Sequence, residues 1–317
     1  MTTVRPAKRA PAPPSGMPSV QIGQSRPMNA AKVVKAGDDP FADLVGEEEQ
    51  LGRFLMFYGE AGMGKTTLAA QFEKPMFITT SGEQGAEIYK QKGVIPKDCP
   101  IVPLPDVFEQ DAIPDGDGHP GWTKCLQTME RFLNAKHDRK TLIIDSVSGL
   151  QELCFQHCAS KLWKGNMTEK TKDGFLSFYA GYTKAAEAYW DAQFLVLCLK
   201  LVRKGFNVIL LAHSAYRTVD NPIGPDFQQY EPQLYKWIWS FTKKKLHGVY
   251  FLGQSVNVAI DEKTKKKKTL GDRRFVGIGP STYFIAKSWI TPTGESEIEC
   301  GETARSEEHT SELQSHS

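Results

Sequence analysis

The sequence contains one glycine-rich loop, Gly59-Glu60-Ala61-Gly62-Met63-Gly64-Lys65-Thr66, which is followed by Thr67. It fits the pattern G-x-x-x-x-G-K-[ST] at every defined position. The apolar run at 53–58 before the loop predicts a short strand, and residues 65–72 after it predict a helix. Glycines let successive backbone N–H groups curl around phosphate oxygens, and a helix start adds partial positive charge. The loop therefore predicts a phosphate-binding turn.

The last residues of this loop indicate the ligand. Lys65 is expected to reach the β- and γ-phosphates of a nucleoside triphosphate, and the Thr66 hydroxyl is expected to ligate magnesium. We therefore expect ATP with Mg²⁺, held by residues 59–67. The alternative is that the sequence matches the phosphate-binding pattern by chance, and the predicted strand before the loop and helix after it argue against this.

Outward from the loop, apolar runs alternate with helical patterns. Such continuous apolar strands separated by helices predict an α/β fold with a mostly parallel sheet covered on both faces. The expected strands are 53–58, 75–80, 101–104, 141–147 and 207–213. The expected helices are 65–72, 83–91, 122–135, 150–163 and 182–203, with a polar insertion at 165–182.

The sequence changes character after His213. A long loop at 216–230, with the pairs Asn221-Pro222 and Gly224-Pro225, leads to an aromatic helix at 234–244. Three β-like segments follow, so the fold class is a P-loop NTPase with a C-terminal β-rich extension. The β-like segments are 248–260, 273–278 and 282–289.

Acidic residues at strand ends are the candidates for catalysis. Asp145 ends the apolar run of the 141–147 segment, where a Walker B aspartate would hold magnesium through water. Ser146 is a candidate N-cap of the next helix, and this structural role is compatible with the Walker B role of Asp145. Glu83, just beyond the second strand, is the candidate that orients or deprotonates the attacking water. Glu83 could equally be an acidic residue at the start of a helix, where the helix dipole stabilises its negative charge. Glu87 and Glu60 are the next candidates for acting on the water.

His213 closes the strand at 207–213. It is a candidate for contacting the γ-phosphate of bound ATP. A core histidine with satisfied hydrogen bonds is the competing interpretation, because an apolar strand end can accommodate either role.

Composition narrows the class of protein. The 317 residues are 40% apolar and 24% charged, with a net charge of +2, so the whole-chain charge gives no argument for nucleic acid. Most of the six cysteines lie in apolar runs, as reduced core thiols do. Cys154, His157 and Cys158 would share a helix face, but no fourth metal ligand is near in sequence. No signal peptide or membrane span is apparent, so we expect a soluble, cytoplasmic protein.

The two ends differ from the middle. Residues 1–37 hold six Lys or Arg, several prolines and no acid, which predicts a disordered basic tail at 1–40. Residues 305–316 read RSEEHTSELQSH and match a translated sequencing adapter, so 305–317 is expected to be an unstructured artefact. The ATPase domain is then expected at 41–304.

Three basic or aromatic features have two interpretations each. Lys263 and the run 265–268 form a predicted hairpin tip that is either solvated or in contact with DNA phosphates. Lys287 and the Arg273-Arg274 pair are candidates for reaching the γ-phosphate of a neighbouring subunit. The Trp237/Trp239 pair favours packing over base stacking.

Four segments together resemble a known family: GEAGMGKTT, TLIIDSVSGL, VILLAHS and TYFIAKSW. In this order and spacing they resemble the RecA-like AAA-type ATP-binding proteins of bacteriophages, including single-strand-annealing recombination ATPases. The resemblance covers about residues 50–290. The family's closing Ala-Lys-x-Arg type of segment reads Ala286-Lys287-Ser288-Trp289 here, which weakens a finger role.

The resemblance implies ATP hydrolysis in phage DNA recombination, annealing or replication. It also implies single-stranded DNA as a partner, homo-oligomers with ATP near subunit interfaces, and a location in the host cytoplasm. It places Glu83 where the family has its glutamate after the strand. Two alternatives remain open: a small-molecule kinase, for which no arginine-rich lid segment is found, and a non-hydrolysing ATP-dependent scaffold or loader.

Overall fold

A computed structural model describes residues 51–105, 118–222, 224–260, 267–289 and 297–299, with side chains left out at 256–260, 267–272 and 299. Contacts divide the chain into two units, Met1–Glu48 and Glu49–Ser317. The predicted tail and the predicted artefact at 305–317 both lie outside the described residues. The fold below is therefore that of the second unit.

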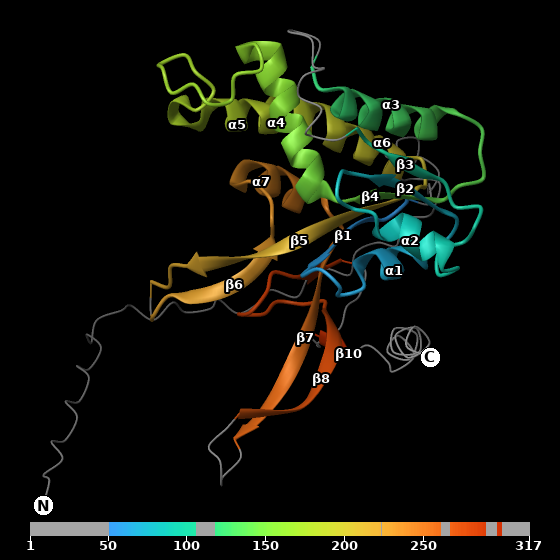
Figure 1. Cartoon of the computed structure of the whole chain (residues 1–317), viewed down its shortest axis with the longest axis vertical. Coiled ribbons are helices and arrows are strands. Elements are labelled where there is room, and N and C mark those ends of the chain that lie inside the picture. Colours follow the sequence, from blue (N-terminus) through green and yellow to red (C-terminus); the bar gives the residue numbers. More distant parts are fainter. Residues whose placement is uncertain (1–50, 106–117, 223, 261–266, 290–296, 300–317) are drawn as a thin grey trace, which may run out of the picture. The chain divides into compact units, whose positions relative to one another are not determined.

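The centre of the fold is a mostly parallel sheet (Figure 1). Ten described strands form it, in the order β10-β8-β7-β1-β5-β4-β2-β3, with β6 joined to β5 and β9 joined to β7. The predicted α/β class with a parallel sheet is confirmed. The core strands are β1 (Phe54–Gly59), β2 (Pro75–Thr79), β3 (Ile101–Pro103), β4 (Thr141–Asp145), β5 (Asn207–Val219) and β7 (Gly248–Ile260).

The sheet is apolar on both faces because helices cover both. In β1, Phe54, Met56 and Tyr58 join the larger core cluster, whereas Leu55 and Phe57 join the smaller one. Such two-sided burial explains why the strands read as continuous apolar runs. The smaller cluster packs under α1 (Lys65–Ala70) and α2 (Gly85–Gln91). The larger one packs under α3 (Pro120–Asn134), α4 (Val147–Trp163), α6 (Val196–Arg203) and α7 (Lys236–Lys245).

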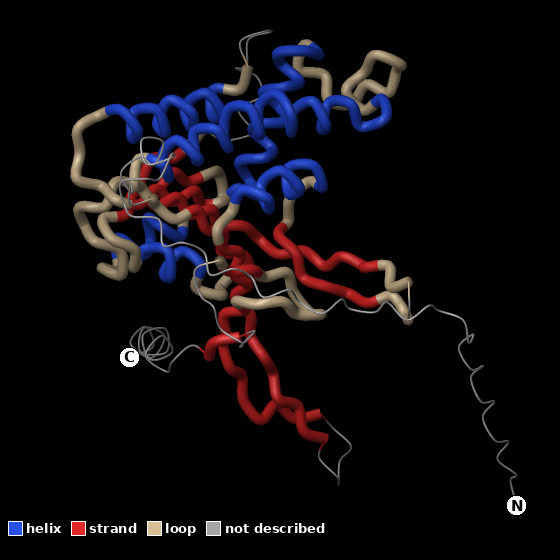
Figure 2. The backbone as a smooth tube through the Cα atoms, turned by 180° about the vertical axis from the view of Figure 1, so that it is seen from behind, coloured by secondary structure: helices blue, strands red, loops and turns tan. Residues whose placement is uncertain are grey.

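The segment predicted as a long loop at 216–230 is a β-hairpin, so that prediction was wrong. β5 continues past His213 to Val219 and pairs antiparallel with β6 (Phe227–Pro232), from Ser214↔Pro232 to Val219↔Phe227. Polar, largely exposed side chains fill this part of β5, so no apolar alternation marks it as a strand. Figure 2 shows β5 with β6 and β7 with β8 as two-stranded ribbons in red.

The predicted helix at 182–203 is one continuous helical run in three parts. α5 (Ala180–Lys184) leads into a π-helical stretch, Ala185–Leu195, and then into α6. Trp190 in the π-helical stretch is fully buried, and its Nε1–H donates to Thr242 Oγ1 of α7 at 2.9 Å. A short 3-10 turn, Ser177–Tyr179, precedes α5 within the segment predicted as an insertion.

The C-terminal strands continue the same sheet. β7 pairs in parallel with β1 and antiparallel with β8 (Lys267–Gly277), which confirms the predicted hairpin. Of the predicted β segment at 282–289, only β9 (Lys287–Ser288) is a strand, and β10 (Glu297–Glu299) was not predicted. Lys263, Lys265 and Lys266 of the basic run lie outside the described residues, and the backbone of 267–268 belongs to β8.

Cysteine and membrane predictions can be compared with the described residues. Cys99, Cys125, Cys154, Cys158 and Cys198 are all buried free thiols, as expected for core cysteines. Within the described ranges no cluster of three or more His, Cys, Asp or Glu side chains could hold a metal ion. None of the described helices combines the length and apolarity needed to cross a bilayer.

Candidate nucleotide-binding site

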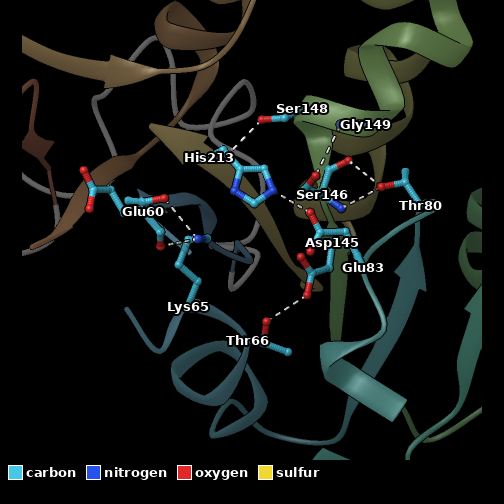
Figure 3. Close-up of polar contacts among 11 residues, drawn as sticks. Glu60, Lys65, Thr66, Thr80, Glu83, Asp145, Ser146, Ser148, Gly149 and His213 are labelled. Carbon is cyan, nitrogen blue, oxygen red and sulfur yellow. Dashed lines mark hydrogen bonds and ion pairs between the residues drawn. The ribbon is translucent and has the colours of Figure 1, made fainter. Parts of the chain in front are cut away.

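The carboxyl ends of four neighbouring strands meet at one edge of the sheet, and the site lies there. In the order β1-β5-β4-β2, Gly59 is level with His213, Leu211 with Asp145, and Asp145 with Thr79. Ligands of open parallel sheets bind in the crevice beyond such strand ends. Figure 3 shows that Lys65, Thr66, Glu83, Asp145 and His213 gather at this edge.

The glycine loop between β1 and α1 has the conformation that a phosphate cradle requires. Gly62 and Gly64 have φ values of 78° and 86°, in the left-handed region that favours glycine. A Cβ added at either position would meet no atom within 4 Å, so it is the backbone conformation, and not a lack of space, that favours glycine there. The predicted helix at 65–72 forms only as Lys65–Ala70, with Gly64 as its N-cap residue.

Lys65 is drawn back against its own loop. Its Nζ donates to the carbonyl oxygens of Gly59 at 3.0 Å and Glu60 at 2.8 Å. The side chain is 8% exposed, and burial lowers the pKa of its ammonium group, an effect opposed by the carboxylates of Asp145 and Glu83. An ammonium group held this way lies in reach of a phosphate bound in the turn.

Thr66 and Asp145 are brought together from elements far apart in sequence. The Thr66 hydroxyl donates to Asp145 Oδ2 at 2.9 Å. Burial, reinforced by the nearby Glu83 carboxylate, raises the pKa of Asp145 to about 6. A hydroxyl beside a carboxylate is the type of oxygen donor set that Mg²⁺ takes alongside nucleotide phosphates. The residues present therefore fit the implied ion.

Glu83 and His213 form the second pair of the site. His213 Nε2 and Glu83 Oε1 are 2.6 Å apart, across 130 residues of sequence. The hydrogen bond from His213 lowers the pKa of Glu83, while partial burial opposes this effect. Glu83 lies just before α2, whose N-cap residue is Gln84, and it faces His213, Lys65 and Ser146. The structure thus places Glu83 both next to the start of α2 and in contact with His213, so both interpretations of Glu83 stay open.

The two reserve acids have different surroundings. Glu87 lies in the first turn of α2 and is exposed. Glu60 lies in the loop, where its Oε1 accepts a hydrogen bond from the Tyr230 hydroxyl at 3.4 Å. Neither acid is linked to His213 or Asp145 by a described contact, so Glu83 is the acid best placed beside the pair Thr66–Asp145.

Serine and threonine residues that the sequence analysis did not assign to the site fix its geometry. The Ser146 backbone N–H donates to Thr80 Oγ1 at 3.1 Å, and Ser146 Oγ accepts from the Gly149 N–H at 3.2 Å. The latter confirms Ser146 as the N-cap of α4. Ser148 Oγ accepts from the His213 N–H at 3.1 Å. Thr80 directly follows β2, and this placement at a strand end was the available signal.

Lys287 lies toward the edge of the sheet formed by the amino ends of the parallel strands, opposite the glycine loop. It pairs through β9 with Val249, near the amino end of β7, and its Nζ donates to the Lys243 carbonyl at 2.6 Å. Lys287 is therefore remote from the glycine loop of its own chain. Arg273 and Arg274 lie in β8, level with Ser255 and Gln254 of β7.

Comparison with known proteins identifies a family, and solved structures provide a structural likeness. Residues 52–288 match the family model described as AAA domain. No curated protein matches the sequence. Among solved structures, the flagellar accessory protein FlaH from Methanocaldococcus jannaschii aligns with a TM-score of 0.38 and 8% identity, over 79% of this chain and 85% of that one.

Proposed function

The chain belongs to the AAA-domain family of ATP-binding P-loop NTPases, and from that premise we propose that it hydrolyses ATP. The observation that carries the proposal is the contact between His213 and Glu83 beside the Thr66–Asp145 pair. Hydrolysis needs an acid that positions water, and an ion-holding pair beside it. Both are present at the edge where the glycine loop begins. We assign the activity to the domain at 41–304.

The loop and the ion-holding pair bind the triphosphate in this account. The backbone of residues 59–67 surrounds the β- and γ-phosphates, and the Lys65 ammonium exchanges its carbonyl partners for phosphate oxygens. Thr66 and Asp145 would hold Mg²⁺, and the ion would supply positive charge beside the phosphate oxygens. Binding of a dication to Asp145 would also favour its charged form over the protonated form that burial stabilises.

Glu83 acts on the attacking water. Its lowered pKa keeps the carboxylate ionised at neutral pH, so one oxygen accepts a hydrogen bond from water while the other stays on His213. An ionised acceptor fixed by a second group orients water better than a mobile side chain does. His213 is then a positioning residue, and it also adjoins the predicted place of the γ-phosphate.

The biological role rests on the resemblance of the four quoted segments to phage recombination ATPases. We infer that the chain acts on single-stranded DNA in phage DNA recombination, annealing or replication, as a homo-oligomer in the host cytoplasm. The same resemblance implies that ATP lies near the interfaces between subunits.

An ATPase assay with and without single-stranded DNA tests the proposal. We expect Mg²⁺-dependent phosphate release that single-stranded DNA stimulates. Release of ADP only with a small-molecule acceptor would indicate a kinase instead. Tight ATP binding without turnover in either condition would contradict hydrolysis and indicate the scaffold or loader.

A further inference from the structure

Helix α7 presents a basic and aromatic face to solvent. Ile238, Trp239 and Thr242 are buried under the helix, whereas Lys236, Trp237, Lys243 and Lys244 are exposed. Positions 236 and 237 lie two turns from 243 and 244, so these four side chains share one side of the helix. Trp237 is 43% exposed, although indole rings are usually covered.

A second segment extends this face. Lys287 of β9 donates from Nζ to the backbone carbonyl of Lys243, near the end of α7. Trp289 follows two residues later, and its backbone N–H donates to the His247 carbonyl oxygen at 3.0 Å. Trp289 is 68% exposed and is held beside the His247 ring, with centroids 6.0 Å apart. We call Lys236, Trp237, Lys243, Lys244, Lys287 and Trp289 the Lys–Trp surface.

Cations on this surface lie over aromatic rings. Lys287 Nζ is 4.6 Å from the ring centroid of Trp289, and Lys236 Nζ is 5.7 Å from that of Trp237. Lys243 Nζ is 5.7 Å from the Trp239 ring. These three ammonium groups are therefore each next to an aromatic ring, an arrangement that matches a ligand with alternating anionic and aromatic groups.

The positive charge of the surface is largely uncompensated. Within the described residues, Lys236, Lys243, Lys244 and Lys287 form no ion pair. Lys245 differs, since it pairs with Asp191. Glu231 is buried, which raises its pKa, and although the charge of Lys243 helps to lower that pKa, Glu231 already forms an ion pair with Arg217 at 2.5 Å. A surface with exposed cations has to meet an anionic partner or water.

Most of the Lys–Trp surface lies away from the nucleotide-binding site. β7 begins at Gly248, which is level with Leu55, and Gly248 is also level with Ser288. Lys243, Lys244, Lys287 and Trp289 therefore lie toward the amino end of β1, on the order of 13 Å along the strand from Gly59. Lys236 and Trp237 lie at the other end of α7, close to Gln233, whose backbone N–H donates to the His213 carbonyl oxygen at 2.8 Å. The part of the surface around the end of α7 is thus the part that lies away from the bound phosphates.

We propose that the Lys–Trp surface binds single-stranded nucleic acid, with the lysines on the phosphates and Trp289 and Trp237 stacked on bases. The inference rests on the proposed function for its partner and adds the place of contact. Stacking on aromatic rings combined with a basic track is the general mode of binding a single strand. α7, with ten residues, is about 15 Å long, so its exposed lysines form a short basic track.

Trp289→Ala tests the surface in the full chain. We expect the affinity for a fluorescein-labelled oligothymidylate, measured by anisotropy, to fall by about 5- to 150-fold, as for the loss of one stacked base. Trp289→Phe keeps a ring and should retain most of the affinity. The matched control is Phe178→Ala, which removes a 97% exposed ring from another part of the molecule. A circular-dichroism melt checks that each variant is folded.

The outcomes separate the surface from the proposed function. If the wild type binds the strand and Trp289→Ala binds equally well, or Phe178→Ala weakens binding as much, the surface is wrong and the DNA-dependent function stands. If the wild type does not bind the strand at all, both are wrong. If Trp289→Ala leaves binding intact but changes the sedimentation velocity, the surface is an interface between copies of this chain, which also overturns the proposal.

Discussion

The two edges of the sheet place charge in opposite ways. At the carboxyl edge, Lys65, Glu83, Asp145 and His213 lie within each other's influence, and each charged group has a partner. Toward the amino edge, Lys243 and Lys244 of the Lys–Trp surface are exposed and form no ion pair within the described residues. Paired, buried groups fix the geometry of one small ligand, whereas exposed cations attract an extended anion with little geometric demand. One sheet therefore provides two sites with separable energetics.

The largest expected effect is that of Lys65→Ala, which should impair ATP turnover and leave the binding of single-stranded DNA intact. Lys65→Ala should lower ATP turnover by at least about 100-fold, because a positioned cation on the transferring phosphate is lost. The affinity for single-stranded DNA without nucleotide should be unchanged. Steady-state phosphate release and anisotropy measure the two. Lys200→Ala, which removes an exposed lysine of α6, is the control, and full ATPase activity in Lys65→Ala would contradict the account.

A medium effect concerns pH and the buried acid. In metal-free, nucleotide-free protein, the pKa of Asp145 is raised to about 6, so its contribution to stability is present at low pH and is lost as pH rises through that value. The free energy of unfolding of the wild type relative to Asp145→Asn should therefore fall by about 3 kcal/mol between about pH 4 and pH 7. Urea denaturation at several pH values measures it.

Another group changes stability in the opposite direction over the same range. Burial lowers the pKa of His157 to about 4, so its contribution rises with pH up to the ordinary value of histidine. His157 is present in both proteins, so its effect cancels in the difference between wild type and Asp145→Asn. If the difference in free energy of unfolding between the wild type and Asp145→Asn were independent of pH, burial would not raise the pKa of Asp145.

The smallest effect belongs to the amino edge. Lys244→Ala should reduce the slope of log affinity for single-stranded DNA against log salt by about 0.7 to 1, since one phosphate contact is removed. Nucleotide affinity should not change. A salt titration of the variant, with Lys200→Ala beside it, measures the slope. Equal slopes in all three proteins would remove Lys244 from the surface.

Local patterns predicted the core of the fold, because the information for it is local. Continuous apolar runs located β1, β4 and the first half of β5, and the glycine loop located the phosphate turn. The second half of β5 was missed, because Tyr216 and Arg217 are exposed and show no alternation. A strand of this kind is fixed by its partner β6, and pairing partners are not visible in a single sequence.

Sequence motifs were enough to name the residues of the site, but most of the contacts between these residues could not be predicted from the sequence. Thr66 and Asp145 could be named from their motifs, and their contact follows from the order of the strands. The contact between Glu83 and His213 spans the sheet, so only the fold reveals it. The Lys–Trp surface escaped prediction because the contact between Lys287 and Lys243 joins segments that are 44 residues apart.

Glu83→Gln tests the central claim most directly, with ATP affinity and single-turnover hydrolysis measured on the same protein. The account predicts wild-type affinity for ATP and hydrolysis slower by roughly 10²- to 10⁴-fold, because the amide cannot accept the proton of water. Glu60→Gln and Glu87→Gln should hydrolyse ATP at the wild-type rate. Undiminished hydrolysis in Glu83→Gln would contradict the assignment of water activation to the Glu83–His213 pair.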